Sequence, residues 1–176
     1  MIDTPGVYDT GRSTKEVEHE IIRCLFLCAP GPHAVLFVVK ANERFTEEEA
    51  NAFRALIAMF GNDITKYMVV VITGDDILSQ KGKTIEGEWD AAGSAISIRR
   101  IVEEVSNRYI VFNNKGDNAT SDKQVLDLLK MVTDMVKSNE NKPYYEDETA
   151  QAEWTKMESK VQRMMPRKMI ARKKKH

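Results

Sequence analysis

The chain has 176 residues, 42% of them hydrophobic and 30% charged, which suits one globular domain with its own core. Its 26 basic and 27 acidic side chains give a net charge of -1, so nucleic acid is not expected as a main partner. Two cysteines, Cys24 and Cys28, are too few for a structural zinc site and are expected to be reduced. Because the sequence has neither a signal peptide nor an apolar run near the roughly 20 residues that span a bilayer, we predict a cytoplasmic protein.

The first half of the chain alternates helical and strand-like patterns. Apolar residues spaced by four predict an amphipathic helix over residues 13–28. The apolar run 34–39 is typical of a strand buried on both faces of a parallel sheet. Thr46 begins a capped helix that should end at Gly61, and a second buried strand is predicted at 67–72.

The second half continues this alternation. Apolar spacing predicts a helix over 98–105, a short strand over 109–112 and a helical face over 125–136. The break at 141–143 is followed by a further helical pattern over 154–164. Strands that alternate with helices long enough to serve as crossovers predict a doubly wound α/β layer.

Ligands of open α/β sheets bind at the carboxyl ends of strands, so polar residues there are the candidates. Asp3-Thr-Pro-Gly6 follows a short apolar start at what we interpret as a strand end. An Asp in this place can hold magnesium through water, and the backbone N–H of a following Gly can approach a terminal phosphate. Asp3 is therefore the predicted metal residue and Gly6 the predicted phosphate sensor, although a bare Asp-x-x-Gly is more often a turn.

Thr73-Gly-Asp-Asp76 follows the second predicted strand, where nucleotide-binding domains of this architecture carry a base-reading sequence. A carboxylate there accepts two hydrogen bonds from guanine, and adenine lacks the matching donors. We therefore assign Asp76 as the base reader, with Thr73 beside it. Gly74 stands where a lysine usually lies along the base, and this departure is expected to weaken stacking.

Asn113 and Asn114 follow the third predicted strand, where backbone N–H groups and an Asn side chain could close over the base. The tetrapeptide from Asn113 to Gly116 is ordinary turn chemistry when taken alone. The order of the three strand ends adds weight, because they offer a metal and phosphate sensor, a base reader and a base cover in sequence. This order predicts a nucleotide-binding ancestry.

The chain resembles the AIG1-type, or immunity-associated, GTPases over about residues 2–137. Beyond the strand ends above, the resemblance rests on three strings, Gly31-Pro-His-Ala34, Arg44-Phe-Thr-Glu-Glu-Glu49 and Met59-Phe-Gly61. It implies an incomplete three-layer parallel sheet of the P-loop GTPase type over residues 1–140 and a helical extension with a basic tail over 141–176.

The resemblance also implies GTP or GDP with Mg²⁺ as cofactors, slow hydrolysis, and self-association of the nucleotide-binding domain into homo-oligomers. The intact protein would then be a nucleotide-controlled assembly switch. No catalytic residue can be assigned, because Val7, Tyr8 and Asp9 follow Gly6 in place of a water-positioning Gln.

The sequence contains no G-x-x-x-x-G-K-[ST] phosphate loop. We expect the strand before that loop to be absent as well, and GTP binding by these 176 residues to be too weak to detect at micromolar ligand. One explanation is a fragment or a gene model begun at an internal Met. The other is a nucleotide-free pseudo-GTPase that acts as an interaction scaffold.

Residues 167–176 form a basic cluster beside the last helical pattern. Such clusters gain roughly 1 kcal/mol per charge near anionic lipid, so association with an anionic membrane surface is one interpretation. A solvated tail is the other. Liposome flotation with and without these ten residues would separate the two.

Overall fold

The structure is a computed structural model of the 176-residue chain. It describes residues 1–6, 14–28, 30–40, 46–76, 82, 85, 98–139 and 142–146. The predicted helix at 154–164 and the basic residues 167–176 lie outside these described residues.

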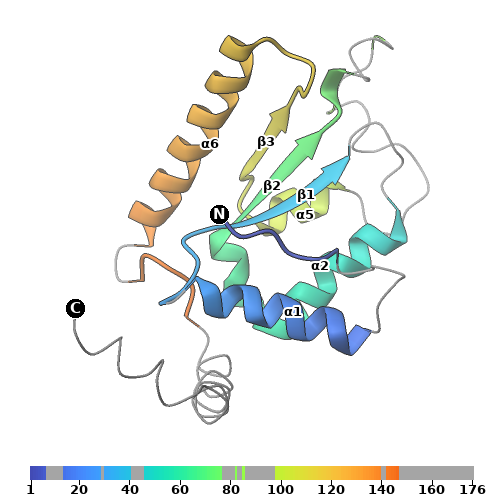
Figure 1. The fold of residues 1–176 in the computed structure, drawn as a ribbon, viewed down its shortest axis with the longest axis vertical. Helices are drawn as coiled ribbons and strands as arrows, with labels where there is room; N and C mark the ends of the chain where they lie inside the picture. The colour runs from blue at the N-terminus through green and yellow to red at the C-terminus, as the bar shows by residue number, and fades with distance from the viewer. Residues whose placement is uncertain are drawn as a thin grey trace, which may run out of the picture. The chain divides into compact units, whose positions relative to one another are not determined.

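Within the described residues, three parallel strands form the sheet, in the order β1 (Val35–Lys40), β2 (Met68–Thr73) and β3 (Tyr109–Phe112) (Figure 1). Phe37 aligns with Val70, and Thr73 aligns with Phe112. Helices connect the strands, as parallel pairing requires. The predicted α/β class with an incomplete parallel sheet is confirmed.

Helices α1 (Thr14–Leu27), α2 (Glu47–Phe60) and α5 (Ile98–Glu104) contribute to the core on one side of the sheet. Every second strand residue faces them, and Phe37 of β1 meets Phe53 of α2 edge to face with ring centroids 5.4 Å apart. The fully buried members of this core include Ile64, Met68, Val70, Ile72, Ile101, Val102 and Val105. This layer supplies the main hydrophobic core.

The opposite face of the sheet is less completely covered. Helix α6 (Asn118–Ser138) lies against β3, and its Met135 is buried. Val69 and Val71 of central strand β2 are also buried, whereas Val38 of β1 is 60% exposed. The prediction that β1 is buried on both faces was therefore wrong for this side. An edge strand gains burial only from whatever covers each of its faces.

The predicted ends of α2 are confirmed in detail. The Thr46 hydroxyl accepts a hydrogen bond from the Glu49 N–H at 3.3 Å, and the Glu49 carboxylate accepts one from the Thr46 N–H at 2.8 Å. This capping box satisfies two otherwise unpaired N–H groups. Gly61 ends the helix with a φ of 77°, a left-handed value that favours glycine.

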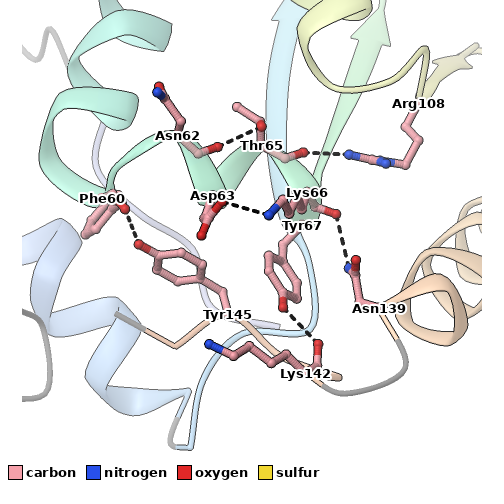
Figure 2. A network of polar contacts seen from close by, with 10 residues as sticks. All are labelled: Phe60, Asn62, Asp63, Thr65, Lys66, Tyr67, Arg108, Asn139, Lys142 and Tyr145. Atoms are coloured by element: carbon pink, nitrogen blue, oxygen red, sulfur yellow. Dashed lines mark hydrogen bonds and ion pairs between the residues drawn. The ribbon is translucent and has the colours of Figure 1, made fainter. Parts of the chain in front are cut away.

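A 3₁₀ helix, η1 (Asn62–Tyr67), precedes β2 and forms the centre of a polar network at the amino edge of the sheet (Figure 2). The Arg108 guanidinium donates to the carbonyl oxygens of Met68 at 3.0 Å and Thr65 at 2.5 Å. Burial lowers the pKa of Arg108 from its usual value. Arg108 therefore ties the start of β3 to the start of β2.

The segment 142–146 closes over the same edge. Tyr67 donates its hydroxyl hydrogen to the Lys142 carbonyl at 2.8 Å, and the Tyr145 hydroxyl donates to the Phe60 carbonyl (Figure 2). The Tyr145 N–H in turn donates to the carbonyl of Pro32 at 2.9 Å. Residues 142–145 belong to the first of two compact units, Met1–Tyr145, and Glu146 begins the second unit, Glu146–His176. The domain boundary predicted at 140/141 stays a prediction.

No helix in the described part of the chain is long and apolar enough to cross a membrane.

Candidate functional site

The loops that follow β2 and β3 meet at the carboxyl edge of the sheet. Thr73 ends β2 and aligns with Phe112, the last residue of β3. The two segments that follow these strands therefore leave the sheet side by side. The Lys115 ammonium then lies 3.2 Å from the Asp76 carboxylate. The structure thus brings together two of the three strand ends that the sequence singles out.

Asp76 is a buried charged side chain, only 8% exposed. Gly74 has a φ of 89°, a left-handed value that turns the chain after β2 and sets the position of Asp76. A buried carboxylate is costly unless charge or hydrogen-bond donors compensate it. The compensation here comes from Lys115, whose side chain is 66% exposed and belongs to the neighbouring loop.

Thr73 has a supporting position. Its hydroxyl donates to the Val39 carbonyl at 3.2 Å and so links the end of β2 to β1. The hydroxyl group is thereby engaged with the sheet itself. Thr73 fixes where the loop to Asp76 begins.

Asn113 organises the loop after β3. Its side-chain carbonyl accepts a hydrogen bond from the Lys115 N–H at 2.9 Å, a local turn typical of asparagine. Asn114 lies exposed at this turn. The Asn113 side chain therefore holds the backbone from which Lys115 projects, and Asn114 is placed at the surface of the same loop.

Gln124 of α6 holds this loop from behind, and the sequence-based prediction missed it. Its side-chain oxygen accepts from the Asn113 N–H at 3.0 Å, and its side-chain nitrogen lies 3.5 Å from the Asn113 carbonyl. The available sequence signal is weak. Gln124 is a polar side chain one turn before Leu128, on the side of α6 that continues to the buried Met135.

The loop reaches α6 through a close approach at Gly116. A Cβ at Gly116 would lie 2.8 Å from the Thr120 methyl carbon. Asp117 then caps α6 by accepting from the Thr120 N–H at 2.8 Å, and the hydrogen bonds from the Thr120 side chain and backbone lower the pKa of Asp117. The carboxyl-edge loop is therefore braced at both ends.

The first strand end predicted from the sequence is placed differently. Residues 1–6 lie outside the sheet, so the prediction that Asp3 follows a strand was wrong for the described structure. Asp3 is exposed, and its backbone carbonyl accepts the Cys24 thiol hydrogen of α1 at 3.5 Å. A Cβ added at Gly6 would meet nothing within 4 Å. A strand needs a paired neighbour, and residues 1–6 are not assigned to a strand.

Metal ligands are not clustered in the described part of the chain, where no group of three His, Cys, Asp or Glu side chains could hold an ion. Cys24 and Cys28 are free thiols, and burial raises the pKa of each. Asp3 offers one exposed carboxylate. Magnesium binding at Asp3 stays a prediction.

The carboxyl edge thus holds hydrogen-bond acceptors in a fixed position. An ionised carboxylate only accepts hydrogen bonds, and Asp76 presents its carboxylate in a largely water-excluded corner. A flat ligand with two adjacent N–H donors would satisfy both oxygens. Such a pair of hydrogen bonds to a charged group is stronger than neutral pairs.

Comparison with known proteins identifies relatives across most of the chain. A family model described as the AIG1 family matches residues 1–164. Immune-associated nucleotide-binding protein 7 of Arabidopsis thaliana is 39% identical over 148 residues, which cover 84% of this chain and 47% of that protein. Immune-associated nucleotide-binding protein 3 of the same plant is 32% identical over 166 residues, which cover 92% and 49%. The chain spans about half the length of these relatives.

Proposed function

The chain belongs to the AIG1 family, and we propose that it binds a guanine nucleotide through the carboxyl edge of β2 and β3. The observation that carries the proposal is the buried carboxylate of Asp76 at the end of the central strand, beside the loop that bears Lys115. The relatives' name, nucleotide-binding protein, supports the same class of ligand.

The base is specified by its hydrogen-bond donors. Guanine presents N1–H and the 2-amino group side by side, and a carboxylate accepts from both. Adenine presents an acceptor at N1, which a carboxylate repels. Asp76 therefore selects guanine over adenine, because leaving a buried carboxylate without donors costs free energy.

The neighbouring residues hold this reader in place. Thr73 anchors the start of its loop to β1, and Asn113 shapes the turn that would cover the base. Asn114 lies exposed on that turn and would contribute its side chain or backbone N–H to the base cover. Gly74 contributes no side chain to stack on the base, so recognition here relies on hydrogen bonds more than on stacking.

The test changes the hydrogen-bonding pattern of the side chain at position 76. In the Asp76→Asn variant the side chain offers one acceptor and one donor, which match the N1–H and C2 carbonyl of xanthine. We expect wild type to prefer GMP over XMP and AMP at millimolar ligand, and Asp76→Asn to prefer XMP over GMP. Ligand-observed NMR titration of the 176-residue chain measures both preferences.

The chain offers a matched control in the adjacent carboxylate. Asp75 is half-buried. Among the described contacts, Lys115 forms its ion pair with Asp76 and not with Asp75. Asp75→Asn changes the same charge at the same loop and should keep the preference for GMP. An unchanged GMP over XMP preference in Asp76→Asn would contradict the assignment of Asp76 as the reader.

Slow GTP hydrolysis that controls self-association is the finer form of this proposal. Its support is family membership, and none of the described residues is assigned as catalytic. Asp3, whose carboxylate is exposed, is the residue proposed to hold Mg²⁺ through water in this form. GTP turnover by the chain, with and without Mg²⁺, tests this finer form.

The second candidate function is that of a nucleotide-free interaction module. In this function the chain binds another copy of itself. The supporting observation is a set of exposed apolar side chains on β1 and α6, namely Val38, Val125, Leu126 and Leu129. Sedimentation velocity of wild type and of Leu126→Glu/Leu129→Glu tests it. For this function, wild type should form a dimer in the absence of nucleotide, and the double variant should be a monomer.

Two predictions from the sequence stay predictions. The basic residues 167–176 are proposed to contact an anionic membrane surface, with the liposome flotation described above as their test. A cytoplasmic location is the corresponding cellular expectation.

A further inference from the structure

Lys115 occupies the acceptor that a guanine base would use. Its ammonium lies 3.2 Å from Oδ2 of Asp76. We propose that Lys115 is an internal competitor for guanine, which closes the base site of the nucleotide-free protein and must leave Asp76 when the base binds. This inference rests on the proposed function, because it names the group that the base displaces.

The two ligands of Asp76 compete for the same oxygen. Bidentate recognition of N1–H and the 2-amino group uses both carboxylate oxygens in one plane. An ammonium at hydrogen-bonding distance from Oδ2 stands in one of those two positions. Because Asp76 is only 8% exposed, there is little room for water to share its oxygens. The Asp76 oxygens thus have donors in both states, from the Lys115 ammonium before binding and from the N–H groups of the base after it.

The backbone of Lys115 is held while its side chain can move. The Lys115 N–H donates to the Asn113 side chain at 2.9 Å, and Gln124 holds the Asn113 N–H at 3.0 Å. The Lys115 side chain is 66% exposed, so its ammonium can swing into water without crossing the core. Opening therefore requires rotation of one side chain and leaves the braced loop in place.

The expected strength of this competition is modest. Ion pairs with one exposed partner contribute little, because water and salt weaken them. We expect removal of the Lys115 charge to tighten guanine binding about two- to fivefold. Adenine affinity should not rise in the same variant, because adenine lacks the donors that would replace the Lys115 ammonium on Asp76.

The experiment uses guanosine, a neutral probe without a phosphate that Lys115 could attract. NMR titrations of the 176-residue chain compare wild type, Lys115→Met and Lys115→Arg at low and high salt. Lys115→Met should bind guanosine about two- to fivefold tighter than wild type and show no salt dependence. Wild type and Lys115→Arg should bind more tightly as salt rises, because screening weakens the internal pair.

The controls separate this inference from the proposed function. Lys123→Met removes an exposed charge from α6 and should match wild type at both salt concentrations. If Lys115→Met binds guanosine selectively but no more tightly than wild type, the proposal that Lys115 competes with guanine is wrong. The assignment of Asp76 as the base reader is then unaffected. Absence of guanosine selectivity in wild type and in every variant overturns the proposed function, and the competitor with it.

Discussion

The two edges of the sheet are built from different chemistry. At the amino edge, Arg108, Tyr67 and Tyr145 donate hydrogen bonds to backbone carbonyls and tie together segments far apart in the sequence (Figure 2). At the carboxyl edge, the buried Asp76 pairs with the exposed Lys115 at 3.2 Å. Stability and recognition are thus assigned to opposite ends of the same strands, and substitutions should separate them.

The largest effect is expected at Gly31, where a Cβ would lie 2.1 Å from the backbone oxygen of Tyr145. Because backbone has to shift, Gly31→Ala should lower the free energy of unfolding by about 1–3 kcal/mol. Urea denaturation measures it. The matched control is Gly116→Ala at the carboxyl edge, where the clash is with the Thr120 methyl group and a small side-chain shift relieves it. Equal losses in the two variants would contradict the division between the edges.

A second substitution at the amino edge should be nearly as costly. Arg108→Met removes the guanidinium hydrogen bonds to the Met68 and Thr65 carbonyls, and of these the Thr65 carbonyl keeps the Met68 N–H as a donor. We expect a loss of about 1–3 kcal/mol in unfolding free energy, partly restored in Arg108→Lys. Binding of GMP to the folded fraction should be unchanged, and a tenfold loss of affinity would show that the edges are coupled.

Gln124 lies on α6, and its side chain supports the loop at the carboxyl edge. Gln124→Leu removes both contacts to Asn113 and should cost about 1 kcal/mol of stability. GMP affinity should also fall severalfold, since the Asn113–Asn114 turn that is proposed to cover the base loses its support. Thermal unfolding and NMR titration of the same sample give both values. A loss of stability without loss of affinity would make Gln124 purely structural.

The smallest effect is a dependence of stability on pH at the start of α6. Hydrogen bonds from Thr120 lower the pKa of Asp117 in the folded chain below its ordinary value of 3.8. The stabilisation is therefore present above that value and is lost as pH falls through the lowered pKa. Asp117→Asn keeps a capping side chain but cannot titrate. Unfolding curves below pH 4 should diverge between wild type and this variant, and parallel curves would contradict the assigned cap.

Local patterns allowed much of the fold to be predicted. The apolar runs of β1 and β2, the capping box at Thr46 and the end of α2 at Gly61 depend on neighbours in the sequence. The AIG1 resemblance, based on ordered strings, was also confirmed. The exposure of Val38 was not predictable, because it depends on which helices cover each face of the sheet.

The sequence indicated where the candidate site would lie, but it did not indicate the contacts between its residues. Strand ends pointed to Asp76 and Asn113, yet nothing local indicated that Lys115 would reach Asp76 or that Gln124 would hold Asn113. Those contacts join loops and helices distant in sequence. Asp3 was misplaced for the same reason, since a short apolar start becomes a strand only beside a partner strand.

The most direct test of the account maps the ligand onto the two edges. Backbone amide signals of the 176-residue chain are followed by two-dimensional NMR as GMP is added, with AMP as the control. We predict GMP-dependent shifts at Asp76 and Asn113–Lys115, and none at Gly31, Arg108 or Tyr145. Shifts centred on the amino edge, or equal shifts with AMP, would contradict a guanine site at the carboxyl ends of β2 and β3.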